Sequence, residues 1–185
     1  MANVNEMFEI TKNKYNGYFN PDDCPVDRYK PWIQFLNEHS LVSYAITESP
    51  PLITEPLRLM CTTATVAKNK RSFSFVIQGT TYTCTSRTIS EALHLPLDNL
   101  EPLPSVNDLI QFFTDLHYQS NINLTKMFKT NLVREWDLIF DTLAKVFSNC
   151  TQNSFQNIPS ILQHIAYAIT YNRRIDIGSL IFNIL

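Results

Sequence analysis

Glycine is scarce in this sequence, which has only three in 185 residues, at Gly17, Gly79 and Gly178. Loops that bind nucleotide phosphates through backbone amides need several glycines at fixed spacing. Neither Gly-x-x-x-x-Gly-Lys-Ser/Thr nor Gly-x-Gly-x-x-Gly occurs here. The scarcity therefore excludes these two phosphate-binding motifs, and it disfavours an architecture built on many tight β-turns.

The four cysteines are few and widely separated, at Cys24, Cys61, Cys84 and Cys150. No Cys-x-x-Cys pair is present, which excludes a zinc ribbon, a zinc knuckle and a thioredoxin-like redox motif. The first ten residues contain two glutamates and no long apolar run, so we do not expect them to act as a secretory signal. We interpret Cys61, Cys84 and Cys150 as buried or half-buried reduced thiols of a cytoplasmic or nuclear protein.

Charged residues are also few, at 17% of the chain, and acidic residues slightly outnumber basic ones. The net charge of −2 and the isoelectric point near 6.1 disfavour general nucleic-acid binding, which usually needs a basic surface. A local basic patch is still compatible with these values. No stretch approaches the ~20 apolar residues that span a bilayer, so we expect no membrane partner.

Apolar side chains, by contrast, are plentiful: they make up 44% of the residues, with aromatics at 12%. A chain of this length can bury about 70% of its unfolded surface. We predict a mainly α fold, a compact bundle of about six to eight helices with one β-hairpin near residues 73–84. Residues 28–185 would form a single helical domain after a polar segment, 1–27. Because the chain ends in an apolar pattern, both a complete chain and one truncated at its C-terminus are compatible with the sequence.

Apolar residues recur at helical spacing along several segments. Aromatic and β-branched residues on either side of Gly79 indicate the hairpin. We interpret Thr88 and Glu91 as a capping box that begins one helix, and Ser105 and Asp176 as the caps of two others. The predicted helices cover residues 31–39, 41–46, 55–67, 88–95, 105–116, 132–147, 159–169 and 177–185.

Five aromatic side chains lie on the apolar faces of two predicted helices. They could line a binding groove, but aromatic residues at helical spacing more often fill a core. We therefore place in the interior Phe112, Phe113, Trp136, Phe140 and Phe147.

No local pattern of reactive residues points to catalysis or metal binding. The histidines, His39, His94, His117 and His164, are far apart in sequence, and none is four residues from another. A nucleophilic side chain needs a base beside it, and no such signature is visible. We expect no catalytic, cofactor-binding or metal-ligating residue, no small-molecule substrate and no enzymatic activity. The alternative is a hydrolase in which a cysteine and a histidine meet only in the folded chain.

Two clusters of basic residues are the candidates for a nucleic-acid contact. Lys68, Lys70 and Arg71 precede the predicted hairpin, and Arg173 and Arg174 lie between the last two predicted helices. Either cluster could bind phosphates through its ammonium or guanidinium groups. The competing interpretation is that these are solvated charged side chains of two surface loops, with no binding role.

The order of several segments resembles an uncharacterised plant transposon protein domain. Such sequences are found in plant genomes beside retroelement polyproteins, where a Gag-like region would lie. The resemblance covers residues 30 to 185, and no catalytic residues belong to it. The segments that carry it are PWIQFL (31–36), CTTA (61–64), TISEALHLPLD (88–98), VREW (133–136), IAYAI (165–169) and RIDIG (174–178).

The resemblance implies a non-enzymatic structural or protein-interaction domain derived from a plant retrotransposon, and one that self-associates. The zinc knuckle common in Gag proteins is absent from this sequence, which weakens the case for direct RNA packaging. If residues 177–185 expose their apolar face, that face would be the surface for self-association. The alternative function is a nucleic-acid-binding module that uses the two basic clusters.

Overall fold

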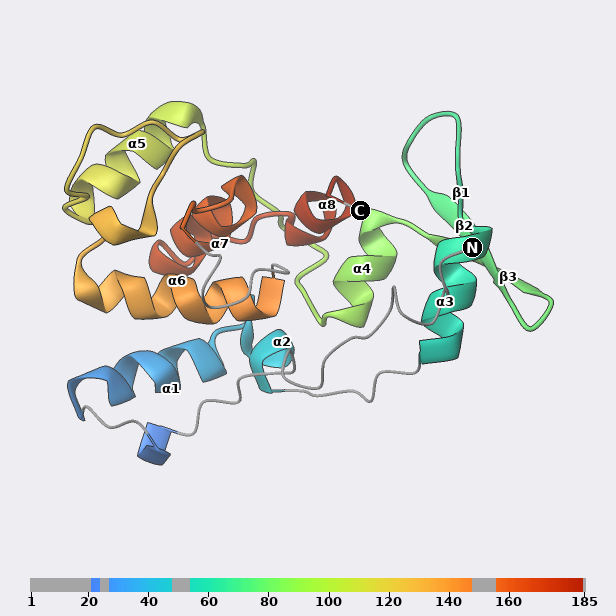
Figure 1. The fold of residues 1–185 in the computed structure, drawn as a ribbon, viewed down its shortest axis with the longest axis horizontal. Coiled ribbons are helices and arrows are strands. Elements are labelled where there is room, and N and C mark those ends of the chain that lie inside the picture. Colours follow the sequence, from blue (N-terminus) through green and yellow to red (C-terminus); the bar gives the residue numbers. More distant parts are fainter. Residues whose placement is uncertain (1–20, 24–26, 48–53, 148–155, 185) are drawn as a thin grey trace, which may run out of the picture.

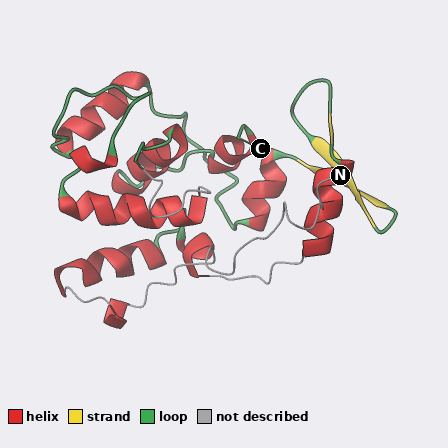
Figure 2. Cartoon of the chain, viewed as in Figure 1, coloured by secondary structure: helices red, strands yellow, loops and turns green. Residues whose placement is uncertain are grey.

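The computed structural model describes residues 21–23, 27–47, 54–147 and 156–184. These ranges contain eight α-helices and one three-stranded antiparallel sheet (Figure 1; Figure 2), so the predicted fold class, mainly α with a β-hairpin, is confirmed. The elements are α1 (Lys30–Glu38), α2 (Ser43–Thr47), α3 (Thr54–Thr63), β1 (Thr65–Val66), β2 (Phe73–Ile77), β3 (Thr80–Cys84), α4 (Ser86–Ala92), α5 (Val106–Asp115), α6 (Arg134–Phe147), α7 (Ser160–Thr170) and α8 (Ile177–Phe182).

Predictions that fall on Cys24, on Cys150 and on most of the N-terminal segment lie outside the described residues. Helices α1, α2, α5, α6 and α7 begin and end within two residues of their predicted bounds. The longest described helix, α6, has 14 residues, and no helix in the described ranges is long and apolar enough to cross a membrane.

Helices α5, α6 and α7 supply most of the buried core. Phe112 and Phe113 from α5 and Phe140 from α6 have no exposed surface. The ring centroids of Phe113 and Phe140 are 6.1 Å apart. Trp136 and Phe147 are partly buried and pack against the same cluster. The five aromatic residues therefore serve the core, as the spacing of the sequence predicts.

The hairpin is confirmed, and the structure adds a third strand that the sequence did not predict. Helix α3 was expected to reach Ala67, but it ends at Thr63, and β1 then pairs with β2. The Thr63 hydroxyl accepts a hydrogen bond from the Val76 amide at 2.8 Å and donates one to the Leu59 carbonyl at 2.6 Å. Thr63 thus links the last turn of α3 to the edge of β2, at the point where the chain leaves the helix and enters β1.

The capping box of α4 lies three residues before the predicted one. Thr85 follows β3 in an extended conformation, and its hydroxyl accepts a hydrogen bond from the Thr88 amide. Thr88 is therefore the third residue of the helix rather than its cap. Glu91 does not return to the backbone: it pairs with Arg87 one turn earlier, at 2.8 Å. The caps predicted at Ser105 and Asp176 are both confirmed.

Helix α8 packs tightly on α4, and Gly178 makes this approach possible. A Cβ atom at position 178 would lie 2.0 Å from the Ser90 Oγ and 2.6 Å from the Ser86 carbonyl oxygen. Ile177 and Gly178 are buried, and Leu180 is packed against the core. Most of the apolar face of α8 is therefore covered. The surface that the sequence suggested for self-association is used inside the fold instead.

We expect Gly178→Ala to lower the free energy of unfolding by about 1–3 kcal/mol, because the added methyl group overpacks the α4–α8 contact. Chemical denaturation followed by circular dichroism measures this change. In a helix without such a contact, replacing glycine by alanine would instead stabilise the chain by up to about 1 kcal/mol. A second substitution, Ser90→Ala, removes the nearer clash and should recover part of the loss. A stabilising effect of Gly178→Ala alone would contradict the observed packing.

Candidate functional site

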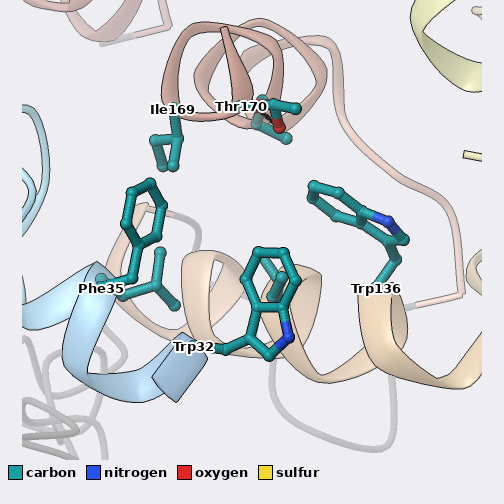
Figure 3. Close-up of a pocket in the computed structure, with 8 residues that line it drawn as sticks. Trp32, Phe35, Trp136, Ile169 and Thr170 are labelled. Atoms are coloured by element: carbon teal, nitrogen blue, oxygen red, sulfur yellow. Dashed lines mark hydrogen bonds between the residues drawn. The ribbon is translucent and has the colours of Figure 1, made fainter. Parts of the chain in front are cut away.

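An aromatic pocket lies between α1, α6 and α7 (Figure 3). The rings of Trp32 and Phe35 from α1 and Trp136 from α6 surround a space that Ile169 and Thr170 of α7 close from the other side. The ring centroids of Trp32 and Trp136 are 6.1 Å apart. Trp32 and Phe35 are each 41% exposed, so the pocket opens to solvent along α1.

The pocket offers space but little chemistry. Its volume is about 110 Å³, well below the ~300 Å³ or more of typical ligand sites. The only hydroxyl in the lining, that of Thr170, donates to the Ala166 carbonyl at 2.7 Å, which leaves it no proton for a ligand. The small volume and apolar lining indicate a packing gap between helices rather than a substrate site.

A larger hollow of about 430 Å³ contains a serine and a histidine one helical turn apart at the start of α7. The His164 Nδ1 lies 2.7 Å from the Ser160 carbonyl oxygen and 3.4 Å from the Ser160 Oγ. Since the carbonyl can only accept, Nδ1 carries the proton and cannot take one from Ser160. No carboxylate of the described residues lines this hollow, so the pair lacks the arrangement of a nucleophile and its base.

The remaining histidines and cysteines are not brought together. His39 is buried, and burial lowers its pKa, so its imidazole is neutral near pH 7. His94 stacks on Tyr44 with ring centroids 3.9 Å apart. Cys84 is half-buried, and burial raises the pKa of its thiol, which disfavours the nucleophilic thiolate. Cys61, at the end of α3, is exposed, so the prediction of a buried or half-buried thiol is wrong at this position.

Groups of acidic, histidine or cysteine side chains that could hold a metal ion do not occur among the residues with a described position.

The two basic clusters differ in what surrounds them. Lys68, Lys70 and Arg71 are exposed on the loop between β1 and β2, which projects from one end of the molecule (Figure 1). No acidic side chain of the described ranges forms an ion pair with them. They are the basic residues best placed to meet an external phosphate.

Arg173 and Arg174 are also exposed, but Arg173 is engaged within the fold. Its guanidinium pairs with the Glu101 carboxylate at 2.5 Å, and the Glu101 amide donates to the Arg174 carbonyl at 2.7 Å. These contacts fasten the loop before α5 to the connection between α7 and α8. The structure therefore separates the two clusters and gives Arg173 a structural role.

No family model, curated protein or solved structure matches the chain. Its function is therefore inferred from its own contacts and surfaces.

One surface was missed by the sequence interpretation, and it belongs to the unit formed by α3 and the sheet, which we call the sheet unit (residues 54–84). No described side chain between Val42 and Ser90 is buried. Phe75 and Tyr82 stack on one face with ring centroids 5.8 Å apart, and Tyr82 is 48% exposed. The large apolar residues at alternate positions of β2, Phe73, Phe75 and Ile77, were the available signal, since they predict an apolar face without saying what covers it.

The two tryptophans of the pocket should differ in their contribution to stability. Trp136 touches Phe112 and Phe140 of the core, so Trp136→Ala should lower the free energy of unfolding by about 3 kcal/mol or more. Trp32 is 41% exposed whereas Trp136 is partly buried, and we expect Trp32→Ala to cost less than half as much. Denaturant titrations of both variants measure the difference. Equal losses would show that Trp32 is a core residue in solution.

Proposed function

We propose that this chain is a non-enzymatic structural domain of plant retrotransposon origin that acts by binding protein, above all further copies of itself. The resemblance to the plant transposon protein domain suggests the origin. The half-exposed apolar face of the sheet unit is the observation that supports the mode of action. The proposal places the protein in the cytoplasm or the nucleus, where the thiols of Cys61 and Cys84 stay reduced.

The support comes from a contrast in burial within one chain. The helical body hides its largest side chains completely, among them Phe112, Phe140 and Leu162. In the sheet unit, by contrast, Tyr82 is exposed, and Phe75, its cross-strand neighbour on the same face, is only half-buried. Contiguous exposed apolar surface on a folded protein is typical of a binding face. A partner that covered this face would complete its burial.

We expect the purified protein to form oligomers whose proportion rises with concentration. Sedimentation velocity from low to high micromolar concentration measures this, and light scattering gives the mass of the species. Because apolar burial drives the association, it should persist when the salt concentration is raised. A protein that stays monomeric throughout this range would contradict the self-association part of the proposal.

A second candidate function, nucleic-acid binding, is favoured by the exposed side chains of Lys68, Lys70 and Arg71 on the β1–β2 loop, which form no ion pair with any acidic residue of the described ranges. Three phosphate contacts would make the logarithm of the binding constant fall with the logarithm of salt with a slope of about −2 to −3. We expect the triple alanine variant at these positions to lose binding. The matched control is Arg173→Ala with Arg174→Ala, which should retain it because Arg173 is held by Glu101.

Fluorescence titration with a labelled oligonucleotide at two salt concentrations measures both variants. No binding by the unmodified protein at low salt would end this second candidate. Equal losses in the two variants would show that the charge of the whole protein, rather than the β1–β2 loop, controls the contact.

A further inference from the structure

Strand β3 (Thr80–Cys84) forms one edge of the sheet, whose strand order is β1-β2-β3. Thr80, Thr81, Tyr82 and Thr83 are all exposed. Figure 1 shows the β2–β3 turn projecting beyond the helices at the end of the molecule. The outer side of β3 is therefore accessible to another chain.

The hydrogen-bonding pattern shows which backbone groups of β3 point outward. The Ala67 amide donates to the Ser72 carbonyl at 2.9 Å, and Thr63 contacts the backbone of Val76, so residues 72, 74 and 76 face β1. Backbone groups alternate along a strand, so residues 73, 75 and 77 face β3. Their partners are Cys84, Tyr82 and Thr80. The amides and carbonyls of Thr81 and Thr83 consequently point away from the sheet.

The two edges of the sheet are unequal. The β1 edge is only two residues long, the Thr63 side chain covers the backbone of Val76 beyond it, and three cationic side chains follow on the next loop. Such features protect an edge from pairing with another strand. The β3 edge has the sequence TTYTC, with no charge and no proline, and with residues of high β-propensity. Within the described residues, no backbone bond satisfies the outward groups of Thr81 and Thr83.

We propose that β3 pairs in antiparallel orientation with β3 of a second copy, across a two-fold axis at Tyr82. This inference rests on the proposed function and names the surface through which it would act. Thr81 would exchange two hydrogen bonds with Thr83 of the second copy, and Thr83 two with Thr81 of that copy. The two sheets would then join into one sheet of six strands.

The symmetry of the edge argues for a second copy as the partner. In the two-fold register, Thr81 lies opposite Thr83 of the second copy, and Thr83 lies opposite its Thr81. The two amides and two carbonyls that each strand points outward are then all hydrogen-bonded. An identical partner also places identical side chains around the axis, where like charges would repel, and β3 carries none. Each Tyr82 ring, already stacked on Phe75, would meet the Tyr82 ring of the other copy.

Charge substitutions at Tyr82 test this register directly, because the residue would lie opposite itself. We expect Tyr82→Lys and Tyr82→Glu each to weaken dimerisation at least tenfold in sedimentation velocity. An equimolar mixture of the two should restore it, since unlike charges then face each other across the axis. Tyr82→Phe is the matched control and should dimerise like the unmodified protein.

A second pair of variants tests the backbone bonds. Thr81→Pro removes an outward amide without removing a bond to β2, whereas Thr81→Val keeps the amide. We expect only the proline variant to weaken dimerisation, with the circular dichroism of both unchanged.

The outcomes separate this inference from the proposed function. If the unmodified protein self-associates but the charged and proline variants associate equally well, β3 is not the interface, and the inference falls while the proposed function stands. If the charged variants are monomeric and their mixture stays monomeric, the two-fold register is wrong. If the unmodified protein is a monomer at high micromolar concentration, self-association and this inference fall together.

Discussion

The close contact between α4 and α8 holds the two parts of this molecule together. Gly178 lets α8 approach Ser90, and at the other end of α8 the ring of Phe182 stacks on Phe73 of β2 with centroids 6.0 Å apart. Ile177 at the start of the same helix belongs to the main core. One helix of six residues thus contacts both the helical body and the sheet. Because no side chain of the sheet unit with a described position is buried, the position of this unit depends on α8.

The two parts are stabilised by different interactions. Burial of aromatic and aliphatic rings holds α5, α6 and α7 together, and this is the dominant favourable term in folding. The sheet unit relies more on hydrogen bonds, including one between the Ser74 and Thr83 hydroxyls at 3.0 Å and those of Thr63. Regions with few buried apolar contacts open more readily than the core, and binding surfaces are commonly drawn from them. The location of the proposed interface agrees with this division.

Much of the fold could be predicted because its signals are local. The 3.6-residue spacing identified α5, α6 and α7, and a serine or an aspartate directly before an apolar helical pattern identified the caps at Ser105 and Asp176. The cap of α4 was misplaced because Thr88, with Glu91 three residues later, matches the usual capping-box pattern, whereas the box that forms pairs Thr85 with Thr88 directly after β3. Strand β1 has two residues, which is too few to show the alternation of side chains that identifies a strand in a sequence. The Glu101–Arg173 pair and the open edge of β3 depend on contacts between distant segments, which a sequence pattern does not contain.

The closure of the first edge of the sheet by Thr63 has a consequence for the size of any assembly. A strand with two open sides can add copies without end and so build a fibre. Here the β3 edge accepts a strand and the β1 edge does not. Once two copies have paired through β3, neither copy has an open strand edge left on its sheet. Association through the sheet would stop at a closed pair, and a larger lattice would need a different surface of the body.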